Sequence, residues 1–348
     1  MVFSCNNAAM RKPTLALALT FLFIALPLRA DDGAASIGAG GLVLMKREPR
    51  ISMAKEVLTI SATRVTVDYD FRNDSDQPIT TEVAFPIPPY EFSPDGASAS
   101  AQGFDDFKLW VAGQPAKFTV ETRAYVGQRD VTAMLTGLGV DPASFGHYNY
   151  DSPFQDALAT FRDVAQLSPA QRAQLVQAKA IDVEGGVDPL WRVEKKYHWT
   201  QTFPARAVVH IRHQYTPVVG GSVTIGEMSH YSATADEFAE LNSFCPTPGL
   251  LHTLIQDQAL AEKKNSLIGL QYVDFILTTA NTWKTPIEDF TLNVERPPAR
   301  DRSQDVNFVS FCWDGPVQKI DADHFSAHVS GLVPAKELRV GYIMGSTK

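Results

Sequence analysis

Residues 64–71 alternate strictly between polar and apolar side chains, and this run restricts the fold more than any other feature of the sequence. Its apolar members, from Val65 to Phe71, fall on one side of an extended chain, and the polar residues between them fall on the other. Side chains alternate across a strand but recur every 3.6 residues around a helix, so only a strand separates the two sets. The run therefore predicts a half-buried antiparallel strand.

A turn and a returning strand are predicted directly after this run. Residues 73–76 read Asn-Asp-Ser-Asp, and such side chains bond to their own backbone in turns. The second strand, over residues 79–85, ends at Pro86, because proline has no N–H to donate to a neighbouring strand. We expect the two strands to pair as a hairpin, and we predict a further hairpin from residues 107–111 and 116–124 around Gly113.

Strand and helix signals alternate along the remaining chain. Further strands are predicted over residues 42–45, 191–202, 205–215, 272–279, 287–295, 306–312, 324–329 and 338–343. Helix signals gather between Gln128 and Asp188, where Asp130 precedes a predicted helix over 131–136 and residues 168–171 (Ser-Pro-Ala-Gln) form a capping box. A second capping box is predicted at residues 234–237, and Thr247-Pro248 precedes leucines at helical spacing.

Short strands separated by turn residues favour a mainly β fold of two β-sandwich-like units with helical insertions. Pro217 and Gly220-Gly221 interrupt the chain, so we place a domain boundary there. The first unit covers residues 31–220 with a helical insertion at about 128–188, and the second covers 221–348 with its helices first. Binding residues usually lie on loops carried by a rigid scaffold, so the insertion is the first region in which to expect function.

Residues 1–30 have the order of a secretory signal. A basic pair, Arg11-Lys12, precedes an apolar stretch of 14 residues, and the small residue Ala30 stands before Asp31. A stretch of this length is shorter than the roughly 18 to 20 residues that cross a bilayer, which argues against a retained anchor. We expect cleavage after Ala30, an exposed and flexible N-terminus over residues 31–41, and a periplasmic or secreted protein with no integral membrane segment. Met10 is an alternative start.

Processing would change both the net charge and the cysteine count. Loss of three basic residues takes the net charge from −8 to −11, which opposes binding to nucleic-acid phosphates. Cys5 would leave with the signal, so Cys245 and Cys312 would remain. An isolated pair in an oxidising compartment is predicted to form a disulfide, and the alternative is two buried free thiols.

The histidines do not predict a metal site. His210 and His213 are three residues apart in a predicted strand, so they point to opposite faces. His324 and His328 share a face, but four residues of extended chain separate them by about 13 Å, too far for one zinc ion. We therefore expect no metal and no cofactor.

Two other patterns are interpreted as chance or structural features. Residues 52–55 match Ser-x-x-Lys, but the further motifs that a penicillin-binding enzyme needs are missing, and Lys284-Thr285-Pro286 carries a proline where such an enzyme has glycine. Oxygen donors crowd the end of the first strand, where calcium could bind, but a solvated turn explains them better. They are Asp68, Asp70, Asn73, Asp74 and Asp76.

Two aromatic runs could offer rings to a sugar or a peptide. Tyr197-His198-Trp199 lies in a predicted strand, where alternating packing is the simpler explanation. Residues 147–150 (His-Tyr-Asn-Tyr) lie in the predicted insertion and are a candidate binding surface. The catalytic residues, if the chain has any, are unknown from the sequence.

Three groups of residues together resemble the exported bacterial family known as domain of unknown function 4424. They are Asp32-Gly33 with Gly40-Gly41-Leu42-Val43; residues 71–76 (Phe-Arg-Asn-Asp-Ser-Asp) with 83–88 (Val-Ala-Phe-Pro-Ile-Pro); and Leu277-Thr278-Thr279, Trp283, Pro286-Ile287 and Ser310-Phe311-Cys312. The resemblance implies a signal peptide and a β-rich exported body, and it brings no activity or cofactor. Residues 65–88 and 209–217 also look like the vault/inter-alpha-trypsin (VIT) β-sandwich domain.

These features favour a non-catalytic binding or scaffold module of the periplasm or cell exterior, with protein or envelope glycan as its partner and no role for nucleic acid. The alternative is a periplasmic hydrolase whose acids meet only in the folded chain. An assembly component of the envelope is a third interpretation. A deep pocket with convergent acids of perturbed pKa would favour the enzyme.

Overall fold

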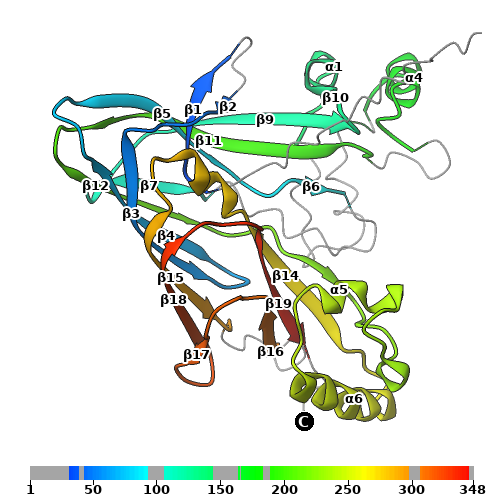
Figure 1. Ribbon diagram of the computed structural model, residues 1–348. Helices are drawn as coiled ribbons and strands as arrows, with labels where there is room; N and C mark the ends of the chain where they lie inside the picture. The colour runs from blue at the N-terminus through cyan, green and yellow to red at the C-terminus, as the bar shows by residue number, and fades with distance from the viewer. Residues whose placement is uncertain are drawn as a thin grey trace, which may run out of the picture.

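The computed structural model describes residues 31–38, 43–92, 106–143, 164, 166–182, 189–297 and 306–344. Strands are the predominant regular structure of these residues and form three sheets (Figure 1). The few helices lie outside the sheets. The mainly β fold predicted from the sequence is therefore confirmed.

Sheet A has seven strands, in the order β10, β9, β11, β5, β1 and β2, with β6 also paired to β11. Their bounds are β1 (Gly33–Ile37), β2 (Val43–Met45), β5 (Ile79–Pro86), β6 (Tyr90–Glu91), β9 (Thr119–Val126), β10 (Arg129–Asp130) and β11 (Arg192–Phe203). All pairings within this sheet are antiparallel.

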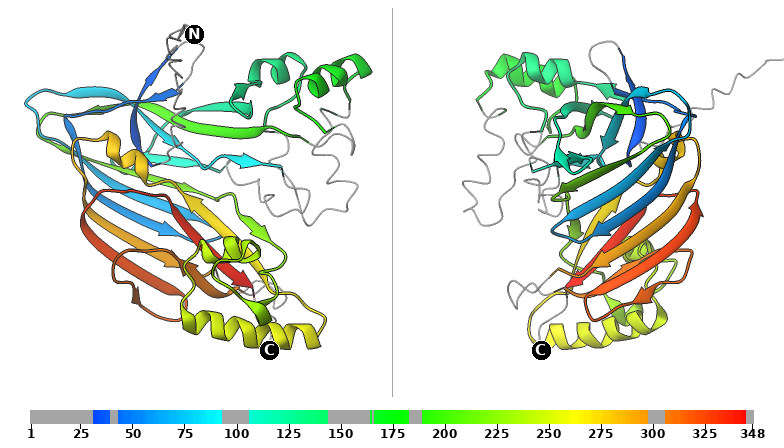
Figure 2. Two further views of the ribbon diagram at one scale, coloured as in Figure 1. Left: turned by 45° about the vertical axis from the view of Figure 1, so that its right-hand side comes forward. Right: turned by 90° about the vertical axis from the view of Figure 1, so that its left-hand side faces the viewer.

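Sheet B has eight strands, in the order β17, β18, β15, β3, β4, β12, β7 and β8. Their bounds are β3 (Ile51–Ile60), β4 (Val65–Asn73), β7 (Lys108–Val111), β8 (Gln114–Pro115), β12 (Val208–Tyr215), β15 (Ile287–Glu295), β17 (Gln318–Lys319) and β18 (His324–Leu332). The pair β3 and β15 is parallel and joins the two halves of the chain. Figure 2 shows this, with the blue strands of the first half beside the orange strands of the second.

Sheet B therefore crosses residue 220, where the sequence suggests a domain boundary. Strands from both halves also contribute to one main hydrophobic core, for example Tyr69 and Phe290. Whether residues 31–220 and 221–348 behave as separate units stays a prediction that requires unfolding measurements.

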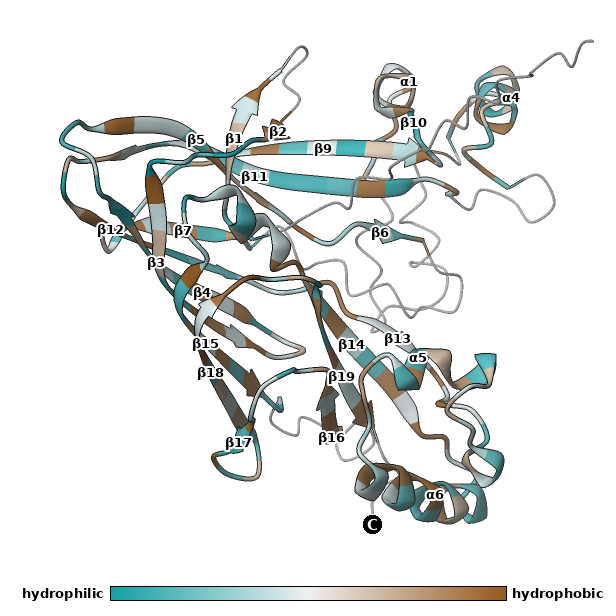
Figure 3. Ribbon diagram, in the orientation of Figure 1, coloured by the Kyte–Doolittle hydropathy of each residue, from teal (hydrophilic) through white to brown (hydrophobic). Residues whose placement is uncertain are grey.

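Sheet C has four strands and carries most of the helices of the second half. Its order is β13 (Gly220–Ser222), β14 (Gly269–Phe275), β19 (Leu338–Met344) and β16 (Val306–Phe311). A second, smaller core forms between this sheet and the segment that holds α5 (Ala239–Asn242) and α6 (Pro248–Lys263). Figure 3 shows hydrophobic residues along β16 and β19 and both polar and hydrophobic residues on α6, as expected for a helix that covers a sheet.

Side-chain caps mark the start of the two longest described helices, whereas α1 and α5 have none. Ser168 caps α4 (Pro169–Gln177) with the complete capping box that the sequence predicts, and Thr247 caps α6. The capping box predicted at Thr234 is wrong, because the short 3-10 turn η5 (Asp236–Phe238) follows Ala235 with no side-chain cap. Helix α1 (Thr132–Gly137) begins one residue later than predicted, and Asp130 accepts a hydrogen bond from the Thr132 N–H. No described helix is both long and apolar enough to cross a bilayer.

The predicted hairpin between β4 and β5 is wrong, although both strands exist. β4 pairs with β3 and β12 in sheet B, whereas β5 pairs with β1 and β11 in sheet A. Asn73 holds this corner, since its side-chain amide donates to the carbonyls of Gln77 and Phe203. Alternation fixes which face of a strand is buried but does not specify its neighbour.

A second strand pair changes sheets at the same corner. β11 in sheet A is followed by β12 in sheet B, and the Arg206 N–H between them donates to the carbonyl of Ser75. The other predicted hairpin is wrong for the same reason. β7 lies in sheet B beside β12, whereas β9 lies in sheet A beside β11. The turn at Gly113 joins β7 only to the short strand β8.

The start of the described chain also differs from the prediction. Asp31 and Asp32 are fully buried, and β1 follows them at the edge of the core. The run of small residues that suggests flexibility instead allows close packing, because a Cβ on Gly33 would lie 2.1 Å from the Met45 side chain. Residues 39–42 lie outside the described residues.

Candidate functional site

Five ionisable side chains that are distant in sequence meet inside the main core, and we call them the acid cluster. They are Asp31, Asp32, Glu56, Tyr69 and His213, and each is fully buried. The two aspartates precede β1, and the other three side chains come from β3, β4 and β12. Each of those three strands turns the residue inward by its own alternation, so the cluster is a product of sheet pairing.

Short hydrogen bonds fix the two aspartates. The Tyr69 hydroxyl donates to Asp31 Oδ1 at 2.5 Å, and the Asp32 N–H donates to the same oxygen at 2.7 Å. The backbone carbonyls of the two aspartates accept from Thr279 Oγ1 at 2.6 Å and from Trp283 Nε1 at 2.5 Å. The turn η6 (Thr278–Thr282) and Trp283 therefore clamp the chain ahead of β1.

The remaining polar atoms of the cluster have no hydrogen-bond partner other than one another among the described residues, and Asp31 and Glu56 share a hydrogen bond when one of the two carboxyls holds a proton. These atoms are both carboxylate oxygens of Asp32 and of Glu56, one oxygen of Asp31 and both ring nitrogens of His213. His213 Nε2 lies 3.5 Å from Asp32 Oδ2, without the alignment of a hydrogen bond. No described lysine or arginine pairs with any of the three carboxyls, so the cluster has acids and no side-chain cation.

Burial dominates the titration of these groups. It raises the pKa of Asp31, Asp32 and Glu56 well above the usual range, and each carboxyl is also affected by another carboxyl of the cluster. Burial lowers the pKa of His213 to about 3, so its ring is neutral at ordinary pH. Raised pKa values are also typical of the paired acids in a hydrolase active site. The three carboxyls of the cluster differ from such acids because they are fully buried.

A cleft lined by tyrosines and prolines lies where the three sheets approach one another, and we call it the tyrosine cleft. Its volume is about 340 Å³, within the range of small-molecule sites. Its described lining residues are Pro88, Pro89, Tyr90, Glu91, Phe92, Tyr215, Pro217, Val218, Gly220, Tyr272 and Asp274. They come from β6 and the residues on either side of it, from the end of β12 and the segment that follows it, and from β13 and β14.

The polar groups of the tyrosine cleft are acidic or hydroxylic. Its charged lining residues are Glu91 and Asp274, and no lysine or arginine is among them. Burial raises the pKa of Asp274, while the guanidinium of Arg339, whose Nε lies 2.8 Å from Asp274 Oδ1, opposes that shift. The same guanidinium lies over the Tyr272 ring, 4.6 Å from its centroid, and so fixes the ring.

Two further cavities have other linings. One, of about 300 Å³, lies between α6 and strands β16 to β18 and includes Arg296 and Lys319. The other, of about 370 Å³, lies beside β9 and has neither tyrosine nor tryptophan in its described lining. Neither combines aromatic rings with carboxylates as the tyrosine cleft does.

Cys245 and Cys312 are joined by a disulfide that ties the segment before α6 to the end of β16. Their Cα atoms are 5.0 Å apart, which is within the usual span of this bond. The bond lies beside the second core and touches neither the acid cluster nor the lining of the tyrosine cleft. Its formation in the protein as produced stays a prediction.

The histidines that the sequence analysis considered are separated as expected. His213 is fully buried, whereas His210 lies on the solvent face of β12 between Asp68 and Asp70. His324 and His328 are both exposed and pair with different acids, Asp321 and Asp289. Within the described ranges, no three metal-ligating side chains gather closely enough to hold an ion.

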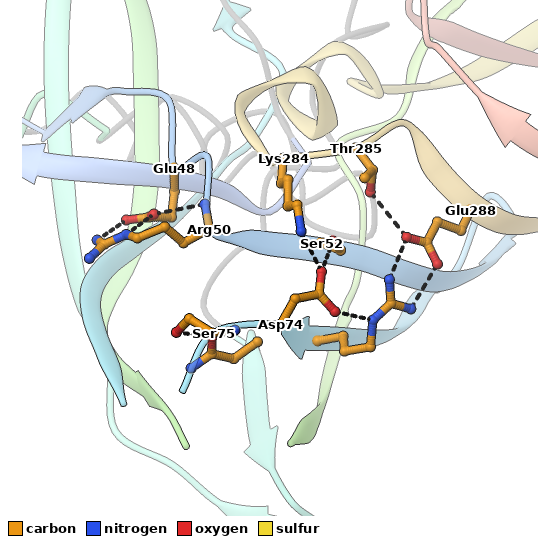
Figure 4. A network of polar contacts seen from close by, with 10 residues as sticks. Glu48, Arg50, Ser52, Asp74, Ser75, Lys284, Thr285 and Glu288 are labelled. Carbon is orange, nitrogen blue, oxygen red and sulfur yellow. Dashed lines mark hydrogen bonds and ion pairs between the residues drawn. The ribbon is translucent and has the colours of Figure 1, made fainter. Parts of the chain in front are cut away.

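The acids of the turn after β4 are engaged by basic side chains. Asp74 accepts from Ser52 Oγ, Arg72 Nε and Lys284 Nζ at 2.7 to 2.9 Å, and Figure 4 shows Lys284 and Ser52 converging on it. Asp76 pairs with Arg206. Ser52, the serine of the Ser-x-x-Lys match, is buried on β3, and its hydroxyl donates to Asp74.

The aromatic candidates from the sequence do not form a surface. Tyr197 and Trp199 are buried in the core, and His198 Nδ1 pairs with Glu82 at 2.6 Å. Residues 147–150 lie outside the described residues, as does much of the predicted insertion, so its role stays a prediction. Neither the acid cluster nor the tyrosine cleft is predicted from the sequence. The available signals were Glu56 within an apolar strand and His213 on the apolar face of β12.

Comparisons with known proteins identify a family but no activity. The model of the family described as "Domain of unknown function (DUF4424)" matches residues 30–340, and the likeness to VIT domains gains no support. Among solved structures, the chain is similar to a "putative nutrient binding protein" from Legionella pneumophila, at 14% identity and a TM-score of 0.39. That match covers 86% of this chain and 68% of the other. No curated protein matches the chain.

Proposed function

This chain belongs to the family of domain of unknown function DUF4424, and on that premise we propose that it is an exported, non-catalytic binding protein of the periplasm or cell exterior. Its ligand occupies the tyrosine cleft. The observation that carries the proposal is the lining of that cleft, where aromatic and proline surfaces lie beside two carboxylates.

The lining of the cleft selects among ligand classes. Glu91 repels phosphates and carboxylates, Asp274 is already paired with Arg339, and the described lining residues include no lysine or arginine that would attract an anion. The net charge of the chain has the same sign. Tyrosine presents a flat apolar ring together with a hydroxyl, a combination that suits ligands with both apolar faces and hydroxyl groups. We therefore assign a neutral saccharide of the cell envelope as the ligand class.

Export rests on separate observations. The order of residues 1–30 is that of a secretory signal, and the disulfide between Cys245 and Cys312 suits an oxidising compartment. Protein purified from the periplasm of an expressing bacterium is expected to show no titratable thiol in denaturant. Two titratable thiols in that material would contradict export to an oxidising compartment.

The hydrolase alternative has less support, although perturbed acids do occur. The acid cluster is fully buried, and its residues line none of the three cavities described above. Asp274 lies in the tyrosine cleft with a raised pKa, but Arg339 holds it in an ion pair. A general acid must reach its substrate within hydrogen-bond distance, and the buried acids do not.

A cleft-filling variant tests the proposal. Val218 lines the tyrosine cleft, so Val218→Trp should fill it and abolish binding to soluble envelope saccharides in isothermal titration calorimetry. Val208→Trp is the matched control, because Val208 is an exposed valine on β12 and does not line the cleft. The control should bind as the unmodified chain does.

Three outcomes would contradict the proposal. Binding by Val218→Trp that equals that of Val208→Trp would show that the cleft is not the site. Binding of peptides but not of saccharides would replace the ligand class. Turnover of a saccharide that stops in Asp274→Asn would favour the hydrolase.

A further inference from the structure

The acid cluster lacks a cation, and this absence needs a physical explanation. Asp31, Asp32 and Glu56 are all fully buried, and no described lysine or arginine reaches them. Both ring nitrogens of His213 lack a hydrogen-bond partner among the described residues, and its Nε2 lies 3.5 Å from Asp32 Oδ2, so no described side chain there balances an ionised carboxylate. An uncompensated buried charge costs several kcal/mol, and such groups are normally paired.

The sequence supplies one further cation at this place. Cleavage after Ala30 adds water across the Ala30–Asp31 peptide bond, which leaves a carboxylate on Ala30 and a protonated α-amine on Asp31. We propose that this α-ammonium is the missing partner: signal removal creates a buried ion pair between the new N-terminus and the carboxylates of the acid cluster. The inference rests on the export that the proposed function includes.

The geometry around Asp31 fixes where the α-ammonium would lie. Thr279 and Trp283 hold the carbonyls of Asp31 and Asp32, and Thr282 Oγ1 accepts from the Ala34 N–H at 3.1 Å. Tyr69 holds the Asp31 carboxyl at 2.5 Å. Covalent geometry keeps the α-nitrogen of Asp31 within a few ångströms of its own carboxyl, and that carboxyl belongs to the cluster.

Cleavage would also explain why the acids are retained in the core. In the uncleaved chain, the nitrogen of Asp31 is a neutral amide, and the carboxyls are neutralised only by holding protons. After cleavage, an ammonium would provide three donors near the carboxyls of Asp31, Asp32 and Glu56, several of whose oxygens accept no hydrogen bond from a described N–H or O–H group. The ion pair would hold the start of β1, which pairs with β5, in place only after cleavage. The chain cut at Asp31 would therefore be more stable than the uncut chain.

A four-chain comparison tests this inference. One chain begins at Asp31, released from a fusion by a protease that leaves no extra residue, and a second carries one additional alanine before Asp31. Each is made with Glu56 and with Glu56→Gln, and unfolding in denaturant is measured at neutral pH. The extra alanine should raise the unfolding equilibrium constant on the order of a hundredfold, because it moves the charge away from a buried partner.

The effect of Glu56→Gln separates charge pairing from simple crowding. The substitution should destabilise the chain that begins at Asp31, where it removes a partner of the ammonium. In the extended chain it should stabilise, because it removes an uncompensated acid. If the extended chain does not fold, Glu56→Gln should restore folding. The inference would be overturned if Glu56→Gln changed the stability of both chains in the same direction, or if the added alanine left the stability unchanged.

Intact mass of the chain exported by a bacterium distinguishes this inference from the proposed function. An N-terminus at Asp31 supports both. An exported chain cut at another position would overturn the inference and leave export standing. Retention of residues 1–30 would overturn both.

Discussion

Two polar networks that share strands β3 and β4 differ in whether their carboxylates have cationic partners. The network of Asp74 joins β3, β4 and the start of β15 through Ser52, Arg72 and Glu288 (Figure 4). The acid cluster joins β3, β4 and β12 to the two aspartates ahead of β1. The turn η6, which precedes β15 in the chain, holds the carbonyl of Asp31 through Thr279. Asp74 pairs with two cations and has a partly exposed side chain, whereas the acids of the cluster are fully buried and pair with no lysine or arginine of the described chain.

The direction of the pKa shifts follows this difference. Hydrogen bonds from Lys284, Arg72 and Ser52 hold the pKa of Asp74 well below its usual range. Burial moves the pKa of Asp32 and Glu56 the other way. An acid near the surface can form an ion pair with a nearby lysine or arginine. A buried acid can form an ion pair only with a cation that is also buried. The chain terminus is such a partner.

The largest expected loss of stability comes from Trp283, which lies next to Lys284 in the chain but contacts the acid cluster. Trp283 is buried against Phe71 and Phe203 and clamps Asp32, so Trp283→Ala should lower the free energy of unfolding by about 4 kcal/mol. Its neighbour Lys284 contacts only the exposed network, and Lys284→Ala should cost less than about 1 kcal/mol. Denaturant unfolding of the two variants measures both values. Equal losses would contradict the contrast between the networks.

A smaller effect is expected from the pH dependence of His213. Its folded pKa is about 3, and its unfolded pKa is about 6.5, so below pH 6.5 the unfolded chain binds a proton that the folded chain does not. Its contribution to stability is therefore present above pH 6.5 and is lost as the pH falls, at about 1.4 kcal/mol per unit. Between pH 6.5 and 5 the chain should lose about 2 kcal/mol relative to His213→Gln.

The acids of the cluster act with the opposite sign. In a chain that retains residues ahead of Asp31, and so has no α-ammonium in the cluster, the raised folded pKa values of the acids favour folding increasingly as the pH falls towards their unfolded values near 4. The difference between the unmodified chain and His213→Gln isolates the histidine, whose ring faces Asp32 and the rings of Tyr69, Phe85 and Trp199. Parallel pH profiles for the two chains would contradict a neutral, buried His213.

The smallest effect concerns salt. Arg72 makes a two-bond pair with Glu288 at 2.8 Å on a partly exposed face, so Arg72→Gln should cost about 0.5 to 1 kcal/mol at low salt and less at high salt. The cost of Glu56→Gln should not depend on salt, because counterions do not reach a fully buried group. Unfolding at low and high sodium chloride compares the two variants. A salt-dependent Glu56→Gln would place the acid cluster in contact with solvent.

The sequence predicts the strands better than their neighbours. The run from Val65 to Phe71 forms β4, and the strand predicted over residues 287–295 forms β15 with the same bounds. The partners of β4 and β5 could not be predicted, because alternation reports burial and the short turn at Asn73 allows either a hairpin or a change of sheet. The parallel pairing of β15 with β3 joins segments more than 200 residues apart and leaves no local signal.

The two candidate sites escaped the sequence analysis for related reasons. Asp31 and Asp32 stand in a stretch of small residues that suggests flexibility, and only the clamp from Thr279 and Trp283 shows them to be buried. The tyrosine cleft collects Tyr90, Tyr215 and Tyr272 from three sheets, and no spacing along the chain relates them.

The accessibility of the N-terminal amine tests the central claim most directly. The native chain that begins at Asp31 is treated with an amine-acetylating reagent, and the extent of acetylation at each site is measured by mass spectrometry of the digested protein. The account predicts that the α-amine of Asp31 stays unmodified while exposed lysines such as Lys336 react, and that it reacts once the chain is unfolded. Acetylation of the native α-amine at the rate of Lys336 would contradict the account.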